Sequence, residues 1–398
     1  MQTTLSMTVA GVRYPNPFVL ASAPPTASRE MIERAFDAGW GGAVIKTLAQ
    51  EEPDGLRDVS PRIQGVRSRG RLMGFTNIEL GTRKTVDDWL EAIAAIKRKY
   101  PDRVLIASLL YGGAPIEKQW REVPALCAQA GADALELNFS CPHGGAELGG
   151  LAEIGTHPDL MAEVLGWVRA STSLPVYVKL PPVSDVVAGA LTCRNGGADG
   201  ISAINTVSSI PGVDVETFRP LLNVNGCSAF GGLSGRMIKP LALRCVAQIA
   251  RTTDLPVSGI GGIYEWRDAV EFMLLGASTV QVCSAVMENG YGIIADLCSG
   301  LAGYLERKGM ASPAELVGRS LPFFAAHGSL DRGVKVVAEV ERVRCRRCGK
   351  CVVSCRDGGY QAIAADAEGF PVVDTARCDG CGLCAQICPF ESMALRRV

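Results

Sequence analysis

Eight of the chain's cysteines lie close together near its C-terminus, at regular spacing. The first run is Cys345-x2-Cys348-x2-Cys351-x3-Cys355, and the second is Cys378-x2-Cys381-x2-Cys384-x3-Cys388. Thiolates are soft, anionic ligands, and this repeated spacing is typical of 4Fe-4S clusters, whose fourth ligand usually comes from the other run. We therefore predict two 4Fe-4S clusters, one held by Cys345, Cys348, Cys351 and Cys388 and the other by Cys355, Cys378, Cys381 and Cys384.

Zinc is the alternative metal for these cysteines. Zinc sites more often pair two C-x2-C units across a longer gap, so two complete four-cysteine runs favour iron. Arg356 replaces the proline that follows the second run, but this change removes no ligand. Such clusters carry single electrons and do no substrate chemistry alone. We therefore expect the chain to bind a flavin, which couples one-electron transfer to two-electron chemistry.

Cys141 differs from the other cysteines because it follows a strand-like segment and begins a glycine-rich loop, in the stretch LELNFSCPHGGAELGG from Leu135. A thiol with a pKa of about 8.5 is protonated at neutral pH and can act as an acid. We expect the glycines to let this loop close over a ligand. The alternative, a small buried residue, is what we expect for the helical cysteines Cys127, Cys193, Cys245 and Cys298.

Short apolar segments alternate with longer amphipathic ones from Phe18 to about residue 309. The eight strand-like segments begin at Phe18, Ala43, Arg103, Ala134, Pro175, Gly200, Pro256 and Thr279. They are apolar almost throughout, as strands buried on both faces should be. This α/β pattern predicts a (β/α)8 TIM barrel, and an open doubly wound sheet is the alternative.

Polar residues or glycines stand at the C-terminal ends of most of these segments, where such barrels build active sites. They are Ala21 and Ser22, Lys46 and Thr47, Asn138, Ser140 and Cys141, Lys179, Asn205 and Thr206, Gly261 and Gly262, and Cys283 and Ser284. The connection over residues 48–84 is unusually long for a loop without structure. We expect it to reach over the barrel mouth and direct Asn77 at the ligand.

Two glycine-rich segments are candidates for binding the flavin phosphate through backbone N–H groups. One is residues 229–240, which contain Gly232 and which we expect to open the seventh helix; the other contains Gly261 and Gly262. Lys46 and Lys179 suit a ring whose reduced form is anionic, although either could be a solvated surface charge. No dinucleotide-binding G-x-G-x-x-G closes a strand, so we expect a separate protein to oxidise NAD(P)H.

Composition excludes several classes of protein. Lys+Arg 40 and Asp+Glu 41 give a net charge of -1, which does not favour nucleic acid or an anionic membrane as a partner. No secretory signal begins the chain, and no apolar run reaches the roughly 20 residues of a membrane span. We expect a cytoplasmic protein with a barrel over residues 1–310, a linker over 311–343 and a small ferredoxin-like domain over 344–398.

Several motifs resemble those of the dihydropyrimidine dehydrogenases. They include ASAPPT from Ala21, NIEL from Asn77, NFSCPHG from Asn138, GGLSG from Gly231 and the paired cysteine runs. The resemblance covers nearly the whole chain in the same order. It is strongest to the FMN-containing, pyrimidine-reducing subunit of the two-subunit bacterial enzymes, within the class 1 dihydroorotate dehydrogenase superfamily.

The resemblance implies a function for each matching residue. Cys141 would be the general acid/base, beside Ser140. Asn77, Asn138, Asn205 and Thr206 would hydrogen-bond the pyrimidine. FMN would contact Ala21, Lys46, Thr47, Lys179, Ser284 and the glycines of the last two strand ends, and Cys283 would line its site.

The resemblance also implies a reaction and a partner. Uracil or thymine would be reduced reversibly to the 5,6-dihydropyrimidine, with hydride from reduced FMN to C6 and a proton from Cys141 to C5. An NAD(P)H-oxidising flavoprotein subunit with FAD and iron–sulfur centres would supply electrons through the two clusters, so we expect a homo- or hetero-oligomer.

Three other functions compete with this interpretation. A dihydroorotate dehydrogenase would need a loop near the substrate carboxylate, where the Glu79 side chain of this chain would repel that group. A related FMN ene-reductase would act on another cyclic amide or heteroaromatic ring. A pure electron-transfer protein would use the barrel only as a scaffold.

Overall fold

The computed structural model describes residues 3–49, 58–111, 116–140, 151–182 and 185–398. The chain divides into two compact units, Met1–Phe323 and Phe324–Val398. Each unit has its own core. Among the described residues, no helix combines the length and apolar character needed to cross a membrane.

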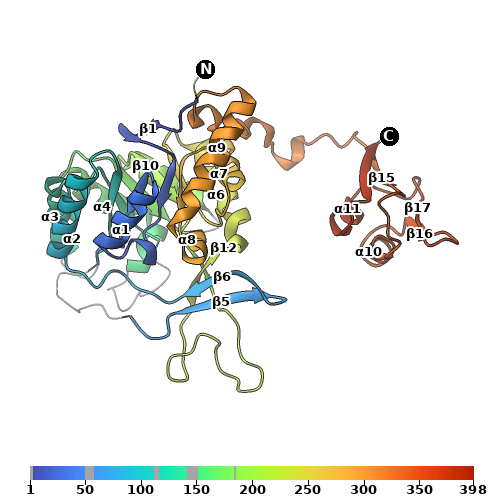
Figure 1. Ribbon diagram of the computed structural model, residues 1–398, viewed down its shortest axis with the longest axis horizontal. Coiled ribbons are helices and arrows are strands. Elements are labelled where there is room, and N and C mark those ends of the chain that lie inside the picture. The colour runs from blue at the N-terminus through green and yellow to red at the C-terminus, as the bar shows by residue number, and fades with distance from the viewer. Residues whose placement is uncertain (1–2, 50–57, 112–115, 141–150, 183–184) are drawn as a thin grey trace. The chain divides into compact units, whose positions relative to one another are not determined.

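Eight parallel strands of the first unit close into a barrel, which confirms the predicted TIM barrel over the open sheet (Figure 1). Strand β14 pairs with β3 and so completes the ring. Each strand overlaps one of the eight segments predicted from the sequence, although β4 and β14 begin one and two residues earlier than predicted. The strands are β3 (Phe18–Leu20), β4 (Gly42–Val44), β7 (Val104–Leu109), β8 (Ala134–Asn138), β9 (Val176–Leu180), β10 (Gly200–Ala203), β13 (Val257–Ile260) and β14 (Ala277–Val282).

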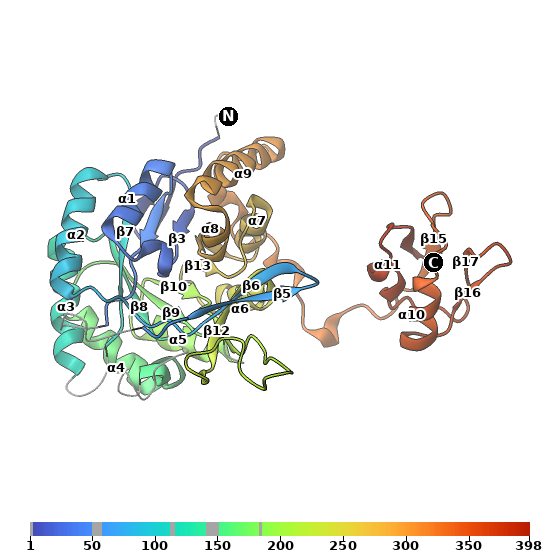
Figure 2. The same ribbon diagram turned by 60° about the horizontal axis from the view of Figure 1, so that its bottom comes forward.

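Amphipathic helices surround the strands, as Figure 2 shows. Helix α2 illustrates why they form: Thr85 caps it by accepting a hydrogen bond from the Asp88 N–H, and its apolar side buries Trp89 and Ile93. The helices of this unit are α1 (Arg29–Ala38), α2 (Val86–Lys99), α3 (Ile116–Ala130), α4 (Pro158–Arg169), α5 (Val186–Asn195), α6 (Lys239–Thr252), α7 (Trp266–Leu274), α8 (Ser284–Asn289) and α9 (Ile294–Lys308).

Short 3-10 helices fill several connections of the chain. They are η1 (Pro24–Thr26), η2 (Leu151–Thr156), η3 (Arg236–Ile238), η4 (Tyr291–Ile293), η5 (Pro313–Leu316), η6 (Leu321–Phe323) and η7 (His327–Ser329). The last three fall in the segment 311–343 that was predicted to be a linker.

The inside of the barrel is apolar at one end and polar at the other. A hairpin of β1 (Met7–Val9) and β2 (Val12–Tyr14) packs against Val104 and Tyr177 at the apolar end. Towards the C-terminal ends of the strands the interior carries buried polar side chains such as Glu136 and Gln281. The strands therefore place their polar residues on the side where a site was expected.

An antiparallel sheet that the sequence did not predict lies beside the barrel strands. Its strands are β5 (Ile63–Ser68), β6 (Arg71–Asn77), β11 (Val207–Ser209) and β12 (Gly231–Gly235), in the order β11-β12-β6-β5. The long connection over residues 48–84 is therefore not without structure. Residues 229–240 contain β12 and lead into α6, which follows the sixth barrel strand, so the expectation that they open the seventh helix was wrong.

The second unit is small and built around the cysteines. Its strands are β15 (Val336–Val340), β16 (Ile363–Ala365), β17 (Pro371–Val373) and β18 (Met393–Arg397), and its helices are α10 (Lys350–Gly358) and α11 (Leu383–Ile387). Strand β15 pairs with β18, and β16 with β17. Each helix starts within one of the two cysteine runs, so the unit repeats one pattern twice.

Candidate active site

An open cavity, about 1150 Å³ with the solvent at its mouth included, lies at the C-terminal ends of the barrel strands. Side chains from strands that are far apart in the sequence line its wall. The predicted site residues among them are Ala21, Ser22, Lys46, Thr47, Asn77, Asn138, Lys179, Asn205, Thr206, Gly261, Gly262, Cys283 and Ser284. The structure therefore brings most of the predicted site together in one place.

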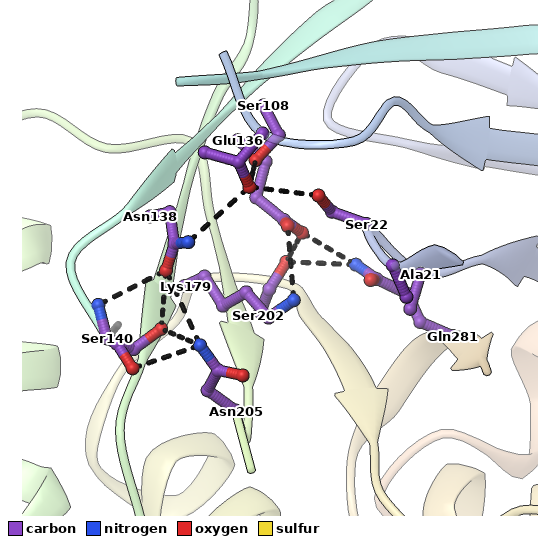
Figure 3. A network of polar contacts seen from close by, with 12 residues as sticks. Ala21, Ser22, Ser108, Glu136, Asn138, Ser140, Lys179, Ser202, Asn205 and Gln281 are labelled. Atoms are coloured by element: carbon purple, nitrogen blue, oxygen red, sulfur yellow. Dashed lines mark hydrogen bonds and ion pairs between the residues drawn. The ribbon is translucent and has the colours of Figure 1, made fainter. Parts of the chain in front are cut away.

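Two asparagines of this wall fix each other through Ser140. The Ser140 hydroxyl donates to Asn138 Oδ1 at 2.9 Å, and Asn205 Nδ2 donates to the Ser140 carbonyl at 2.9 Å (Figure 3). Asn138 ends β8 and Asn205 follows β10, so these bonds tie two strand ends together. Ser140 is buried and does not itself line the described part of the cavity, which makes it a residue that positions the amides.

A chain of hydroxyl groups continues from these amides. Ser22 and Thr47 share a hydrogen bond of 3.0 Å, and Thr47 shares one of 2.9 Å with Ser108 on β7. Asn138 Nδ2 lies 3.5 Å from Thr47 Oγ1, so the chain reaches the amide network. Ser108 was not predicted as a site residue, and it supports Thr47 from outside the cavity wall.

Lys179 is buried, so it is not a solvated surface charge. Its Nζ lies 3.6 Å from Glu136 Oε1, and the two side chains project into the barrel from neighbouring strands. Glu136 is fully buried and accepts hydrogen bonds from Ser202 at 2.7 Å and Gln281 at 2.8 Å. These hydrogen bonds hold the Glu136 carboxylate in place beside Lys179. The ion pair therefore positions the lysine, which can present its ammonium group to an anionic ligand in the cavity.

Lys46 also has a buried acidic partner. Its Nζ lies 2.9 Å from Glu79 Oε2, and Arg62 Nε lies 3.2 Å from Glu79 Oε1. Arg62 is also 3.7 Å from Asp58 Oδ2, so a network of alternating charges leads away from Lys46 and Glu79 in the cavity wall. The sequence placed Glu79 next to the ligand but could not show these pairs, because Lys46 and Arg62 belong to different elements.

Asn77 is held at the cavity by strand pairing. Its Nδ2 donates to the Gly232 carbonyl at 3.1 Å, and its Oδ1 accepts from the Glu79 N–H at 3.3 Å. Gly232 lies in β12 and is not in the described cavity wall, whereas its neighbours Ser234 and Gly235 are. The carbonyl of Gly232 supports Asn77 in this geometry, and its contact with the cofactor stays a prediction.

Two glycines after β13 expose their backbone to the cavity. Gly261 and Gly262 have φ values of 128° and 76°, which favour glycine. A Cβ on Gly262 would lie 2.7 Å from the Lys239 Cβ, so only glycine fits there. Backbone that is this accessible suits a phosphate group, as predicted for the flavin.

Tyr264, which was not predicted as a site residue, lines the same side of the cavity. The Arg236 guanidinium stacks on its ring at 3.6 Å, and its hydroxyl donates to Glu288. Sequence analysis missed this tyrosine, although it comes two residues after the predicted Gly262.

The cysteines of the first unit differ in exposure. Cys127, Cys193 and Cys245 are buried as expected, whereas Cys298 is only half-buried and Cys227, for which no role was predicted, is exposed. Burial raises the pKa of the Cys283 thiol to about 11, although Lys179 and Lys46 oppose the shift. Cys283 therefore lines the cavity as a neutral thiol. Cys141 and the glycine-rich loop after it lie outside the described residues.

The eight cysteines of the second unit surround two separate cavities. Cys345, Cys348, Cys351 and Cys388, named cysteine group 1, line one of them. Cys355, Cys378, Cys381 and Cys384, named cysteine group 2, line the other. This is the grouping that the sequence predicts.

The cysteine groups suit iron–sulfur clusters better than single ions. A single zinc ion would need its cysteine sulfurs at about 2.3 Å from one point. A cluster instead binds each thiolate through a separate iron, so its four ligands can stand apart around one cavity.

Family comparisons agree with this architecture. Residues 4–305 match the family model described as dihydroorotate dehydrogenase, and residues 338–395 match the 4Fe-4S dicluster domain. The chain belongs to the dihydroorotate dehydrogenase family. It is thus an oxidoreductase of a family that binds FMN, and it carries a domain for two 4Fe-4S clusters.

Relatives differ in how much of the chain they cover. The NAD-dependent dihydropyrimidine dehydrogenase subunit PreA of Escherichia coli is 40% identical over 99% of this chain and 96% of its own length. The chloroplastic dihydropyrimidine dehydrogenase (NADP(+)) of Arabidopsis thaliana is 37% identical over 86% and 83%. The catalytic subunit of dihydroorotate dehydrogenase B from Pyrococcus abyssi is 36% identical over 80% and 99%.

A solved structure shows the same fold. The dihydroorotate dehydrogenase of Eimeria tenella, in complex with ferulenol, superimposes with a TM-score of 0.66 at 19% identity, covering 79% of this chain and 88% of that one. Together, the comparisons confirm the resemblance, the fold and the cofactors that the sequence predicted.

Proposed function

We propose that this chain reversibly reduces the C5–C6 double bond of a pyrimidine base, uracil or thymine, to the 5,6-dihydropyrimidine. The observation that carries the proposal is the convergence of Asn77, Asn138 and Asn205 on one cavity. Uracil presents alternating amide carbonyl and N–H groups, and asparagine side chains offer the matching donors and acceptors. The relative named as a dihydropyrimidine dehydrogenase subunit matches 99% of the chain, which supports this choice.

Some cavity residues suit binding of FMN, and others suit binding of the pyrimidine. Lys46, Lys179 and the glycine pair Gly261 and Gly262 suit the flavin, because they offer cations and exposed backbone for its ring and phosphate. FMN, when bound, supplies hydride chemistry at C6 of the pyrimidine. Asn138 and Asn205 would help to hold the ring in the plane that this chemistry needs, and their hydrogen bonds with Ser140 fix both side chains before substrate arrives.

Glu79 adds a carboxylate acceptor to this wall. A pyrimidine N–H can donate to a carboxylate oxygen, and such charge-assisted bonds are stronger than neutral ones. The ion pairs with Lys46 and Arg62 hold the Glu79 side chain in position. Glu79 thus favours a neutral ring with an N–H group over a ring that carries its own carboxylate.

Cys141 is the proposed proton donor to C5. It is bonded to Ser140, which the amide network holds beside Asn138 and Asn205. A protonated thiol at this position can give its proton to the ring face opposite FMN and recover it in the reverse direction. Replacement of Cys141 by alanine should therefore stop turnover while FMN and iron remain bound.

Electrons are proposed to come from an NAD(P)H-oxidising flavoprotein, in a hetero-oligomer with this chain. The name of the Escherichia coli relative, an NAD-dependent enzyme subunit, supports a partner of this kind. The two cysteine groups give the chain a place to receive single electrons when the clusters are bound.

Dihydroorotate oxidation is the competing function, because the Pyrococcus relative carries that name. Orotate has a ring carboxylate, and a family member that binds it needs a cation for that group. In the described cavity wall, Glu79 already engages the Lys46 and Arg62 side chains and adds a negative charge of its own. We therefore favour the unsubstituted pyrimidine.

An anaerobic assay of the purified chain separates these functions without needing the partner. Dihydrouracil, dihydrothymine and dihydroorotate are each offered with dichlorophenolindophenol as the electron acceptor. Turnover with the first two and little with dihydroorotate is the expected result. Preference for dihydroorotate would reject the proposal, and no turnover with any of them would favour the electron-transfer scaffold.

A further inference from the structure

The two cysteine groups have the same ligands but lie among different charges. Arg346, Arg347 and Lys350 line the cavity of cysteine group 1, and no acidic side chain of the described residues does. Asp379 lines the cavity of cysteine group 2, where no basic side chain of the described residues is found. The local charge is therefore positive at the first group and negative at the second.

The cations beside cysteine group 1 are mostly uncompensated. Among the described residues, Arg346 and Lys350 form no ion pair. Arg347 stacks its guanidinium on the Phe370 ring at 5.3 Å and donates to the Glu368 carbonyl, contacts that hold the side chain without cancelling its charge. Their positive field acts on whatever occupies the cavity.

Hydrogen bonds to the sulfur atoms add to the difference. At cysteine group 1, Cys388 Sγ lies 3.3 Å from the Ser392 backbone N and 3.2 Å from the Ser392 hydroxyl. A ligating thiolate has no proton, so the hydroxyl would be the donor there. Cys345 Sγ of the same group also accepts from the Arg347 backbone N–H at 3.4 Å. At cysteine group 2, the sulfur contacts among the described residues come from the backbone, from the Ala338 N–H to Cys378 at 3.4 Å and from the Ala362 N–H to Cys355 at 3.3 Å.

The helix starts and the charges outside the cavity walls do not reverse the difference in local charge between the two groups. Each cavity faces the start of a helix, α10 or α11, so backbone dipoles favour negative charge at both. Glu391 stands beside cysteine group 1 but is exposed and outside its cavity wall, and Arg377 stands beside cysteine group 2 in the same way. The charged residues of the cavity walls, Arg346, Arg347, Lys350 and Asp379, are exposed as well, but they border the space that the clusters would fill and so act over a shorter distance.

Reduction adds a negative charge to a cluster, and nearby cations and hydrogen-bond donors stabilise that charge. We propose that Arg346, Arg347, Lys350 and Ser392 give the cluster of cysteine group 1 the higher reduction potential, and that Asp379 lowers the potential at cysteine group 2. The first electron that the second unit receives then resides at cysteine group 1, whichever group meets the donor. This inference depends on the two clusters and not on the identity of the substrate.

An anaerobic redox titration of the holo chain, reduced by dithionite and followed by electron paramagnetic resonance, tests the proposal. The wild type should show two reduction steps. The double variant Arg346→Gln/Lys350→Gln should shift the higher-potential step downward and move the lower step much less. Asp379→Asn, which keeps an oxygen to accept the Cys381 N–H, should shift the lower step upward.

Lys335→Gln is the matched control, because it removes one exposed positive charge from the same unit at a residue that lines neither cavity. This variant should leave the potentials of both reduction steps unchanged. Iron content per chain must equal that of the wild type in each variant. A double variant that moves only the lower step, or an Asp379→Asn variant that moves only the higher one, would assign the potentials the other way and overturn the proposal. Two variants with full iron and unchanged steps would also overturn it.

Discussion

Side chains at the barrel mouth are held by partners from other elements before any ligand binds. Asn138 accepts hydrogen bonds from Ser140 and Asn205. Lys179 pairs with Glu136, which accepts hydrogen bonds from Ser202 on β10 and Gln281 on β14. Fixed partners reduce the entropy that the side chains lose when a ring binds, so the site is pre-organised. A single substitution here should affect substrate binding more than stability.

Asn138→Ala tests this pre-organisation. The variant removes an amide that faces the ring and frees both Ser140 and Asn205. Two hydrogen bonds of about 1.4 kcal/mol each correspond to a loss of about 100-fold in kcat/KM for dihydrouracil. Asn195→Ala, at the exposed end of α5, is the control and should keep wild-type kinetics. Equal kinetics in both variants would remove Asn138 from the proposed site.

Cysteine reactivity should follow burial. Burial raises the pKa of Cys127 and Cys193 to about 12, and that of Cys283 to about 11. A raised pKa lowers the thiolate fraction, and the thiolate is the reacting form, so these three should resist iodoacetamide at pH 8. Exposed Cys227 should be alkylated under the same conditions.

Peptide mass spectrometry measures each cysteine separately, and the unfolded chain, in which all thiols react, serves as the reference. As the pH is raised, reaction of Cys283 should begin before that of Cys127 and Cys193. Rapid labelling of Cys127 in the native chain at pH 8 would contradict the burial described here.

At the scale of elements, the strands of the barrel could be predicted and the sheet beside it could not. Barrel strands such as Val104–Leu109 and Val176–Leu180 are apolar on both faces, a local signal that needs no knowledge of neighbours. Strand β12 is rich in glycine, and it pairs with β6, which lies far from it in the sequence. Long-range pairing of this kind leaves no periodic pattern, so the supporting contact of Gly232 with Asn77 was missed as well.

The close approach of β6 and β12 gives a prediction at this scale. A Cβ on Gly74 would lie 2.1 Å from the Ser234 carbonyl oxygen, so Gly74→Ala must push the strands apart. Overpacking of this kind costs about 1–3 kcal/mol of unfolding free energy. Because Asn77 and Ser234 line the cavity from these strands, KM for dihydrouracil should rise together with the loss of stability.

Gly70→Asn is the control for this variant. Gly70 lies in the turn between β5 and β6 with φ 79°, and a Cβ there would meet nothing within 4 Å. Asparagine tolerates that backbone conformation better than other residues, so both stability and KM should stay close to wild type. Denaturant unfolding and steady-state kinetics measure the two effects. A Gly74→Ala variant with wild-type values for both would show that the sheet does not position the cavity wall.

At the scale of the whole molecule, the two units differ in what stabilises them. The first unit buries a large apolar core between strands and helices. The second has a small core, whose buried members are Val337, Ala338, Cys351, Ala362, Ile363, Cys378, Cys384 and Met393. Three of these eight residues are predicted cluster ligands, so much of that core is formed by groups that bind metal. Units of this size usually need a bound metal or disulfide bonds to remain folded.

Removal of iron should therefore unfold the second unit and spare the first. When metal binding contributes much of the folding free energy, the apo form loses its structure. Anaerobic chelation followed by hydrogen exchange and mass spectrometry should show lost protection in β15 and β18, while β7, β8 and β9 keep theirs. The barrel needs no iron for its core, so the chelated chain should also retain bound flavin. Protection that persists over residues 336–398 without iron would mean that the small core is sufficient, and the clusters would then serve electron transfer without stabilising the fold.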